Sequence, residues 1–407
     1  MREVRYPAPA LILKIGGYPI HHGGLGIIRS LGMLGIPVYT VIENRYAPAA
    51  VSRYLTGTFV WNTRGVERTQ LLEGLEKIGQ QLNQPTILVP TDDYAASLIA
   101  EEAVALREWF VFPDVKANIP RTLANKQLLH GLSKDLGIPQ PQAIFPNSIH
   151  EVQVALAKLT FPAAIKLISS WPRAAGTPSV QIVDSPEALL SFYHQRQIVQ
   201  TQRFFIQEHI PDAEDWFFHG YCNTQSDCLV AFTGRKLRSY PPHGGITVLG
   251  QSVTNDVLSS QAERLLKAIN YAGIMDIDYR LDKRDGQYKI LDFNPRIGAQ
   301  FRLFEDRNGI DVVRAMYYDL TGQPVSRSPQ IDGRIFIVEP QDFLCSLYSL
   351  WRRKLTLGDW WRSLRGVREF AWFKWNDPAP CLILSIHMVI RGIVKAAHRV
   401  GLRRPSD

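Results

Sequence analysis

Short apolar runs alternate with longer amphipathic stretches through the first 115 residues of the chain. Five runs rich in β-branched and aromatic residues have the pattern of strands, and they lie at 11–16, 37–42, 58–61, 86–90 and 109–112. The stretches between them have the apolar spacing of helices, and they lie at 24–35, 65–82 and 92–108. Strand–helix alternation of this kind predicts a parallel sheet with helices on both faces.

A glycine-rich stretch from Gly16 to Gly26 follows the first predicted strand and opens the first helix. Its backbone N–H groups can approach an anion, but Arg29 replaces the third glycine of the dinucleotide fingerprint. A substrate-facing loop, a bare tight turn and a dinucleotide site all remain open here. Nearby, Asp92 and Asp93 could face the same crevice, or Thr91 or Asp92 simply caps the following helix.

Alternating apolar and polar residues return around Asp285-Gly286, a turn signal that predicts a β-hairpin. Asp276 and Asp278 alternate with apolar residues on the first arm. The second arm ends before Pro295, because proline cannot continue a central strand.

The second arm carries a carboxylate, an amide and a guanidinium at alternate positions, in Asp292, Asn294 and Arg296. Residues two apart share one face of a strand, so these side chains should point the same way, with Phe293 toward the core. With Asp278 they would gather three oxygen ligands and one arginine, a set suited to Mg²⁺ and phosphate. The alternative is an edge strand with a solvated polar face, although gathered carboxylates need a cation or a proton to relieve their repulsion.

Further candidate residues precede the hairpin. Lys166 lies on a predicted apolar strand, so its ammonium group needs a carboxylate, a phosphate or solvent as a partner. The polar loop at 169–179 has the layout of a flap over phosphates. A linker at 208–210 can offer its backbone to a base edge, and Asp215 can reach ribose hydroxyl groups. Further on, Lys236 and Arg238 are expected on one face of a strand, next to Arg235.

In their order and spacing, these residues resemble the ATP-grasp superfamily of carboxylate–amine ligases, which includes biotin carboxylase, carbamoyl-phosphate synthetase and D-Ala–D-Ala ligase. The resemblance covers roughly residues 1–325. Lys126 and Lys166, which lie 40 residues apart, match the two basic nucleotide contacts of the family. The implied cofactors are ATP and Mg²⁺, with Mn²⁺ as an alternative ion.

The resemblance also implies roles for the remaining candidates. The hinge that receives adenine matches Gln207, Glu208 and Ile210, and the ribose-binding acid matches Asp215. The metal ligands match Asp278, Asp292 and Asn294, with 14 residues between the two aspartates. Arg296, in the sequence D-F-N-P-R, matches the arginine that steadies the transferred phosphate.

The implied fold is α/β and α+β. An N-terminal parallel-sheet domain at 1–115 precedes a two-lobed ATP-grasp domain at 116–325, and a basic, Trp-rich helical extension follows at 326–407. Within the middle domain, the lobe with the flap is expected at about 140–207 and the lobe with the metal site at about 208–325.

Two features depart from the family pattern. The flap is poor in glycine, because only Gly176 remains beside Trp171 and Pro172, and phosphate contacts are then expected from Ser169, Ser170 or Arg173. Asp292 stands where the family usually has Glu, so a metal ion is expected closer to the strand.

The expected reaction is ATP-dependent activation of a carboxylate as an acylphosphate, followed by attack of an amine. Arg296, Lys236 and Arg238 are the predicted catalytic residues, the latter two binding the acid substrate or the leaving phosphate. His21, His22 and His243 are read as loop residues or, alternatively, as bases. The alternatives are a carboxylase, disfavoured because the chain has no Met-Lys-Met segment, an ATP-grasp kinase, and a non-catalytic ATP-binding module.

The composition, with 45% apolar and 21% charged residues among 407, is that of a soluble globular chain. Its four cysteines form no C-x-x-C motif, so we expect no zinc site and no disulfide, with Cys222 and Cys228 as ordinary residues on neighbouring strands. The apolar run near the N-terminus is too short for a signal peptide. These features predict a cytoplasmic protein.

Charge is distributed unevenly along the chain. Residues 351–407 contain 12 Lys and Arg against 4 Asp and Glu, so they carry the whole net charge of +8, and they contain five of the nine Trp residues. His387 and Arg391 interrupt the last apolar run, which argues against a spanning helix. A helix packed on the body is the plainer expectation, and peripheral contact with the inner face of a membrane is the alternative, which would suit a lipid-linked acid as well as a small-molecule one. We expect no nucleic acid partner.

Overall fold

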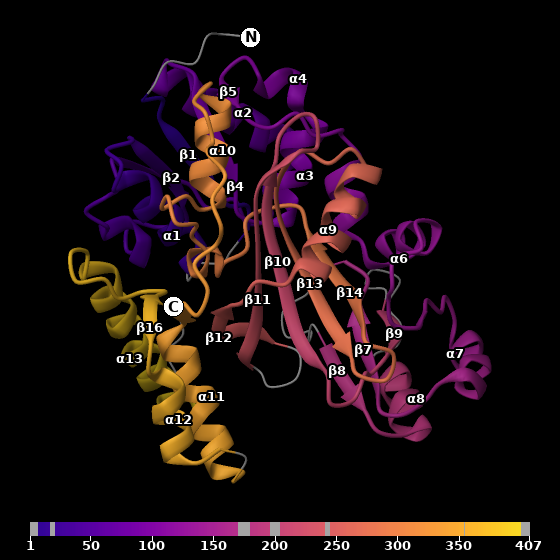
Figure 1. Ribbon diagram of the computed structural model, residues 1–407. Coiled ribbons are helices and arrows are strands. Elements are labelled where there is room, and N and C mark those ends of the chain that lie inside the picture. Colours follow the sequence, from indigo (N-terminus) through magenta and orange to yellow (C-terminus); the bar gives the residue numbers. More distant parts are fainter. Residues whose placement is uncertain are drawn as a thin grey trace.

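The structure is a computed structural model, described for residues 7–16, 21–169, 180–195, 204–240, 245–353 and 355–399. Within these ranges the chain forms three sheets, surrounded by helices (Figure 1). The first sheet is parallel, in the order β3-β2-β1-β4-β5, and its strands are β1 (Ala10–Leu13), β2 (Val38–Ile42), β3 (Gly57–Val60), β4 (Thr86–Pro90) and β5 (Phe110–Val111).

Alternate residues of β1 enter two different cores. Ala10 and Ile12 pack with residues of α1 (His22–Gly32), whereas Leu11 and Leu13 pack with residues of α2 (Arg68–Leu82) and α3 (Asp93–Glu101). Because strand side chains alternate between faces, helices cover both sides of this sheet. The predicted mixed α/β fold with a parallel sheet is therefore confirmed. The short elements η1 (Pro48–Val51) and α4 (Ala103–Leu106) complete this part.

A small antiparallel sheet follows, in the order β6-β9-β7-β8. Its strands are β6 (Ala143–Ile144), β7 (Ala163–Leu167), β8 (Val180–Val183) and β9 (Phe204–Glu208). Its core also takes residues from the flanking helices α7 (Ile149–Ala155) and α8 (Pro186–Gln195). The chain reaches this sheet through α5 (Ile119–Ala124) and α6 (Lys126–Asp135), and η2 (Leu156–Lys158) follows α7.

The largest sheet has seven strands, in the order β14-β13-β10-β11-β12-β15-β16. They are β10 (Glu214–Cys222), β11 (Cys228–Tyr240), β12 (Ile246–Ser252), β13 (Gly273–Asp282), β14 (Gln287–Asn294), β15 (Ile335–Ile337) and β16 (Val367–Phe370). One face packs on α9 (Asp256–Ala268) and the other on α10 (Val312–Leu320), since neighbouring Phe217 and Phe218 belong to different cores. The turn η3 (Phe301–Leu303) precedes α10.

Residues after 325 contribute β15 and β16 as well as α11 (Glu339–Trp351), α12 (Leu357–Leu364) and α13 (Ala379–Arg399). This stretch is therefore not purely helical, because the apolar run of β15 pairs with the edge of β12 and β16 pairs with β15. The division into domains that we expected from the sequence remains a prediction.

The cysteines require a correction. Cys222 and Cys228 do lie on neighbouring strands, but they form a disulfide, with their Cα atoms 4.0 Å apart. The turn between β10 and β11 sets these two residues directly opposite each other, and directly opposed cysteines are close enough to bond. Local spacing in the sequence did not reveal this register.

Candidate functional site

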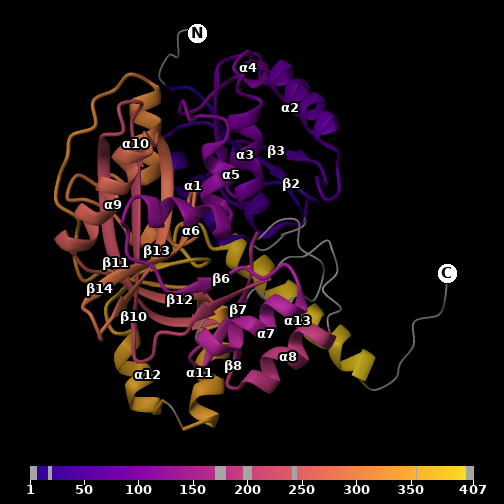
Figure 2. The ribbon, with the colours of Figure 1, turned by 90° about the vertical axis from the view of Figure 1, so that its right-hand side faces the viewer.

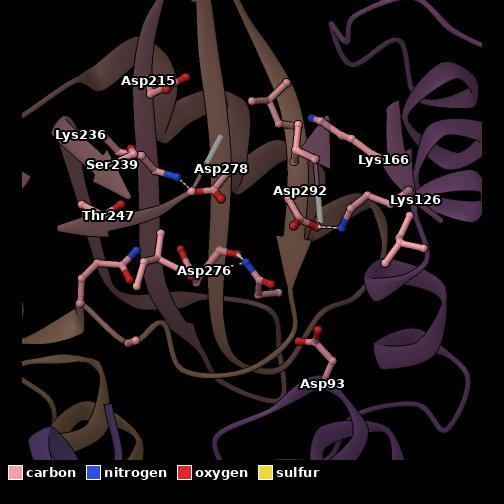
Figure 3. Close-up of a pocket in the computed structure, with 18 of the residues that line it drawn as sticks. Asp93, Lys126, Lys166, Asp215, Lys236, Ser239, Thr247, Asp276, Asp278 and Asp292 are labelled. Atoms are coloured by element: carbon pink, nitrogen blue, oxygen red, sulfur yellow. Dashed lines mark hydrogen bonds and ion pairs between the residues drawn. The ribbon is translucent and has the colours of Figure 1, made fainter. Parts of the chain in front are cut away.

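The candidate site is a cavity of about 650 Å³ where the three sheets meet. One wall is the end of the parallel sheet, a second is the β7–β9 sheet with α6, and the third is the seven-stranded sheet (Figure 3). Eleven of the twelve predicted site residues line it, and they are Lys126, Lys166, Gln207, Glu208, Ile210, Asp215, Lys236, Asp278, Asp292, Asn294 and Arg296. The twelfth, Arg238, lies elsewhere.

The predicted hairpin is formed by β13 and β14. Asp278 pairs in register with Asp292, and Asp276 with Asn294. The turn between the strands uses Gly286 at φ +71°, a conformation that favours glycine. On the opposite face, Ile277 and Phe293 are fully buried, as the alternation predicted. The hairpin therefore gathers its polar residues on the cavity side.

Each candidate metal-binding carboxylate has a lysine partner. The Lys236 Nζ atom lies 2.8 Å from Asp278 Oδ1, and the Lys126 Nζ atom lies 2.5 Å from Asp292 Oδ1 (Figure 3). Lys126 is the first residue of α6, and its backbone N–H donates to the carbonyl oxygen of Ile168, which ties α6 to the end of β7.

The candidate ligand set contains two carboxylates and one amide. Burial raises the pKa of Asp278, and the neighbouring carboxylates add to this against the pull of Lys236. In the part of the chain that the structure describes, no group of three or more His, Cys, Asp and Glu residues has a metal-binding arrangement. Asn294 would thus have to supply the third oxygen.

Lys166 faces the hairpin from β7. Its Nζ atom donates to Gln207 Oε1 at 2.5 Å. Burial lowers the pKa of Lys166 to about 8, and the positive charges of Arg280 and Lys126 add to the effect. The wall opposite the carboxylates therefore presents two ammonium groups. The charge of Lys126 is paired with a carboxylate, whereas Lys166 donates to a neutral amide.

The expected hinge leaves β9 beside these lysines. The Glu208 N–H donates to the carbonyl oxygen of Gln142 at 2.9 Å, and the Glu208 carboxylate accepts from Arg284 at 2.5 Å. Ile210 is buried, with 2% of its side chain exposed. Asp215, on the facing strand β10, accepts a 2.7 Å hydrogen bond from Arg280 Nε. Backbone polar groups, an apolar side chain and a carboxylate thus border one end of the cavity.

Arg296 lies at the other end. Its Nε donates to Asp93 Oδ1 at 3.2 Å, and its Nη2 donates to Asn294 Oδ1 at 3.0 Å. Its Nη1 is 3.7 Å from Asp276 Oδ2. Burial opposes the charge of Arg296, but the surrounding carboxylates outweigh it and raise its pKa. Arg296 therefore joins the start of α3 to the hairpin.

Sequence reasoning missed the buried pair of His219 and Asp276. His219 Nε2 lies 3.0 Å from Asp276 Oδ1, and both residues are almost fully buried. The Asn294 amide in turn donates to the Asp276 carboxylate at 3.4 Å. A Cβ atom on Gly298 would come within 2.3 Å of the His219 ring, so there is room only for glycine at position 298. The available signal was a histidine within the apolar run of β10.

Arg238 is not brought into the site. Its Nε donates to Asp342 Oδ1 and its Nη1 to Ser363 Oγ, each at 2.7 Å, so it is directed at α11 and α12. The expectation that Lys236 and Arg238 share one face is corrected by a shift in the β11–β12 register between them. Arg235 lies 5.8 Å from the Trp216 ring, also outside the cavity lining.

The parallel sheet supplies the last wall. Asp92 both faces the cavity and caps α3, because it accepts from Ala95 N at 2.9 Å and Ile15 N at 2.7 Å. Burial raises the pKa of Asp92 to about 6. His21 caps α1 and His22 begins it, and burial lowers the pKa of His22 to about 4. Both histidines therefore have positions set by the helix.

Several expectations fall outside the described residues. They concern part of the first glycine stretch, at 17–20, and His243. They also concern the flap residues Ser170, Trp171, Pro172, Arg173 and Gly176.

Comparison with known proteins supports the fold and the hairpin. Residues 247–325 match the family model for the carbamoyl-phosphate synthase L chain, ATP binding domain, a range that contains β13 and β14. D-aspartate ligase from Enterococcus faecium is 22% identical over 245 residues, which is 57% of this chain and 58% of that protein. The match thus spans less than two thirds of the length of this relative.

Solved structures share the architecture. The biotin carboxylase domain of Hydrogenobacter thermophilus 2-oxoglutarate carboxylase, in complex with MgADP, ADP and bicarbonate, has a TM-score of 0.61 at 13% identity, covering 79% of this chain and 71% of that one. For L-amino acid ligase from Bacillus licheniformis the TM-score is 0.59 at 15% identity, covering 79% and 75%. The fold is thus that of nucleotide-dependent ligases and carboxylases. These matches support the resemblance to the ATP-grasp superfamily.

Proposed function

We propose that this protein is an ATP-dependent ligase that joins a carboxylate to an amine. One observation supports this above all others. Asp278, Asp292 and Asn294 lie on one wall of the cavity. Lys126 and Lys166 extend from the opposite wall toward the two carboxylates (Figure 3). Oxygen ligands and phosphate-binding cations on facing walls suit the triphosphate of a metal-bound nucleotide.

In this proposal each residue has a defined task. Lys126 and Lys166 hold the α- and β-phosphates, while the hinge at 207–210 receives adenine and Asp215 binds the ribose. Arg296 holds the γ-phosphate and then the acylphosphate, and Lys236 binds the acid or the leaving phosphate. We leave Arg238 out of this set because its guanidinium is bound to α11 and α12.

The donor set fits Mg²⁺, with Mn²⁺ as the alternative. Asp278, Asp292 and Asn294 would hold the ion, which would neutralise charge on the phosphates when bound. The lysines that now neutralise the two carboxylates have long side chains, so they can turn to phosphate oxygens once a cation binds the carboxylates.

The reaction balances without a covalent enzyme intermediate. A carboxylate oxygen attacks the γ-phosphorus, and the bond from that phosphorus to the β-phosphate bridging oxygen breaks to release ADP. The amine then attacks the acyl carbon and loses a proton, and inorganic phosphate leaves with one oxygen of the original carboxylate. The residues named above position these groups and stabilise their charge.

Amino acids are the first substrates to examine, because the named relatives are a D-aspartate ligase and an L-amino acid ligase. A lipid-linked or other large acid remains in the proposal as a second class of acceptor. The first test measures ADP release with MgATP and pooled acids and amines. We expect turnover only when both pools are present, and loss of turnover with EDTA or with Asp292→Asn.

An isotope experiment separates the ligase from its rivals. With an ¹⁸O-labelled carboxylic acid, a ligase transfers one labelled oxygen to inorganic phosphate, whereas a kinase leaves phosphate on a hydroxyl product. ADP release that requires bicarbonate instead of an amine would indicate a carboxylase. Nucleotide binding without turnover on any pool would indicate a binding module. Any of these three outcomes would overturn the ligase.

A further inference from the structure

Helix α11 presents its apolar side to solvent. Its buried face consists of Asp342, Cys345 and Ser346, each at most 3% exposed. Its outward face carries large apolar side chains that are 43–73% exposed, and they are Phe343, Leu344, Leu347, Tyr348 and Trp351. A helix on the surface of a globular protein normally buries such a stripe. Because the apolar side of α11 faces outward instead of inward, this side of the helix is suited to binding an apolar partner.

Helix α13 repeats this arrangement. Leu384 is 2% exposed and belongs to the same core as the buried Trp372, so the start of the helix is fixed to the body. The outward face is apolar at spacings of three and four residues and is 52–63% exposed, at Leu382, Ile386, Val389, Ile390 and Ile393. In Figure 2, the far end of α13 extends clear of the three sheets.

The helix between them and the connecting segment add further exposed apolar groups. In α12, Leu357 is 67% and Trp361 is 63% exposed. Trp375, which precedes α13, is 88% exposed. All three helices and the segment before α13 thus carry large exposed apolar side chains, and a concentration of such side chains marks an interaction site. No helix in the described ranges is long and apolar enough to cross a membrane.

The charge around these side chains is positive. Six arginines are exposed in this region, and they are Arg352, Arg353, Arg362, Arg365, Arg368 and Arg391. Between 339 and 394, Asp359 is the one exposed acid among the described residues. The Arg352 guanidinium lies 4.9 Å from the ring centre of Trp351, so one of these cations lies beside an exposed aromatic ring. Arginine beside tryptophan and aliphatic side chains is typical of proteins that lie in a membrane interface.

We propose that α11, α12 and α13 form a docking surface for an anionic lipid bilayer. The apolar side chains would enter the boundary of the hydrocarbon region, and the arginines would contact the headgroups. A second copy of the chain fits less well, because a symmetric contact would bring the arginines of both copies together. Exposed leucine, isoleucine and phenylalanine have no role in binding a phosphate backbone, which disfavours a nucleic acid.

The test is flotation of the full chain with vesicles of about 30% phosphatidylglycerol in phosphatidylcholine, at about 0.1 M NaCl. We expect co-flotation with these vesicles and much weaker binding to pure phosphatidylcholine. Neutralising Arg352 and Arg353 together as R352Q/R353Q should weaken binding by roughly 25-fold, or about fivefold for each arginine.

The apolar contribution is tested separately. Val389→Asp with Ile393→Asp should reduce partitioning at least tenfold, because two buried aliphatic groups are replaced by charges that anionic lipid repels. The matched control is Val104→Asp with Val257→Asp, which alters side chains that are 96% and 67% exposed on the body of the protein. The control variant should float like the wild type, and near-ultraviolet circular dichroism confirms that both variants are folded.

Three results would overturn the proposal. The first is that the wild type does not bind the vesicles even at low salt. The second is that the α13 variant and the control variant bind the vesicles equally well. In the third, light scattering shows a dimer that the α13 variant disrupts while no form of the chain binds vesicles, and the surface is then an interface between copies.

Discussion

Lys166 and Lys236 line the same cavity but have different electrostatic surroundings. Burial lowers the pKa of Lys166 to about 8, because the negative charges of Asp292 and Asp215 only partly offset the loss of solvation and the ammonium group donates to the neutral Gln207 side chain. For Lys236, burial also opposes the charge, but Asp278 at 2.8 Å and the nearby Asp215 outweigh it and raise the pKa. Lys236 therefore keeps its charge well above neutral pH, whereas Lys166 loses its charge as the pH rises through about 8.

This difference predicts a pH dependence for nucleotide binding. Lys166 is mostly charged at pH 7 and mostly neutral by pH 9, because its pKa of about 8 lies between these values. Phosphate favours the ammonium form, so binding above pH 8 must take up a proton and should weaken by up to about tenfold per pH unit. Calorimetry at several pH values, in buffers of different ionisation enthalpy, measures both effects. Lys166→Arg should remove the dependence, and a pH-independent wild type would contradict it.

The role of Asp276 in catalysis can be separated from a role in nucleotide binding. It lies beside His219, accepts from Asn294 and is 3.7 Å from Arg296, so it orients groups that we assign to metal and phosphate. Asp276→Asn should lower kcat about 10- to 100-fold, as is typical when a partner of a ligand is changed. The KM for ATP should change little, because the lysine wall is intact. A larger effect on KM than on kcat would show that Asp276 acts in nucleotide binding instead.

At the scale of elements, β11 connects the cavity to the C-terminal helices. Lys236 extends into the site, and two residues later Arg238 contacts α11 through Asp342, which is 1% exposed. Removing one partner of a buried ion pair leaves an uncompensated charge, whereas removing both relieves it.

We therefore expect Asp342→Ala to lower the free energy of unfolding by about 3–5 kcal/mol. The double variant Arg238→Met/Asp342→Ala should recover part of this loss. Arg362→Ala, at an ion pair whose side chains are 68% and 48% exposed, is the control and should change stability by less than about 1 kcal/mol. Denaturant titration of these variants and of Arg238→Met alone gives the values, and additivity of Arg238→Met and Asp342→Ala would mean that the pair is not coupled.

Elements with strong local signals could be predicted from the sequence. The β13–β14 hairpin followed from its Asp-Gly turn and its alternation, and the parallel sheet followed from regular spacing of strands and helices. The face of Arg238 could not be predicted, because a register shift in β11 interrupts the alternation and leaves no mark in the residue pattern. The outward-facing apolar side of α11 was not predicted either, because the sequence indicated only a helical extension at 326–407.

Some site residues could be predicted from local sequence, whereas others come together only through the pairing of distant strands. Asp278, Asp292 and Asn294 are close in sequence, so strand geometry alone brought them together. His219 and Asp276 meet only because β10 and β13 pair in one register, and such a register depends on the whole sheet. The disulfide between Cys222 and Cys228 was missed for the same reason.

At the scale of the whole molecule, contacts between distant parts of the chain hold the walls of the cavity in place. Arg296 joins the hairpin to Asp93 at the start of α3, and Lys126 joins α6 to Asp292. A ligand in this cavity would touch all three sheets. The segment before α13 is fixed to α1 by a further buried pair, Arg29 and Asp377, with side chains 2% and 1% exposed.

Asp377 is the centre of that attachment. It accepts from Arg29 Nε at 2.9 Å, from Ser52 Oγ at 2.8 Å and from the Arg53 N–H at 2.9 Å, just before α13 begins. Asp377→Ala would leave the Arg29 charge buried with only carbonyl oxygens as partners, so we expect stability to fall by about 3–5 kcal/mol. Hydrogen exchange should accelerate first in 379–394, because this segment loses its anchor while the sheets keep theirs. Asp114→Ala, at an aspartate that is 75% exposed, should change neither quantity. Uniform acceleration across the chain would mean that the pair stabilises the whole fold and not the attachment of α13.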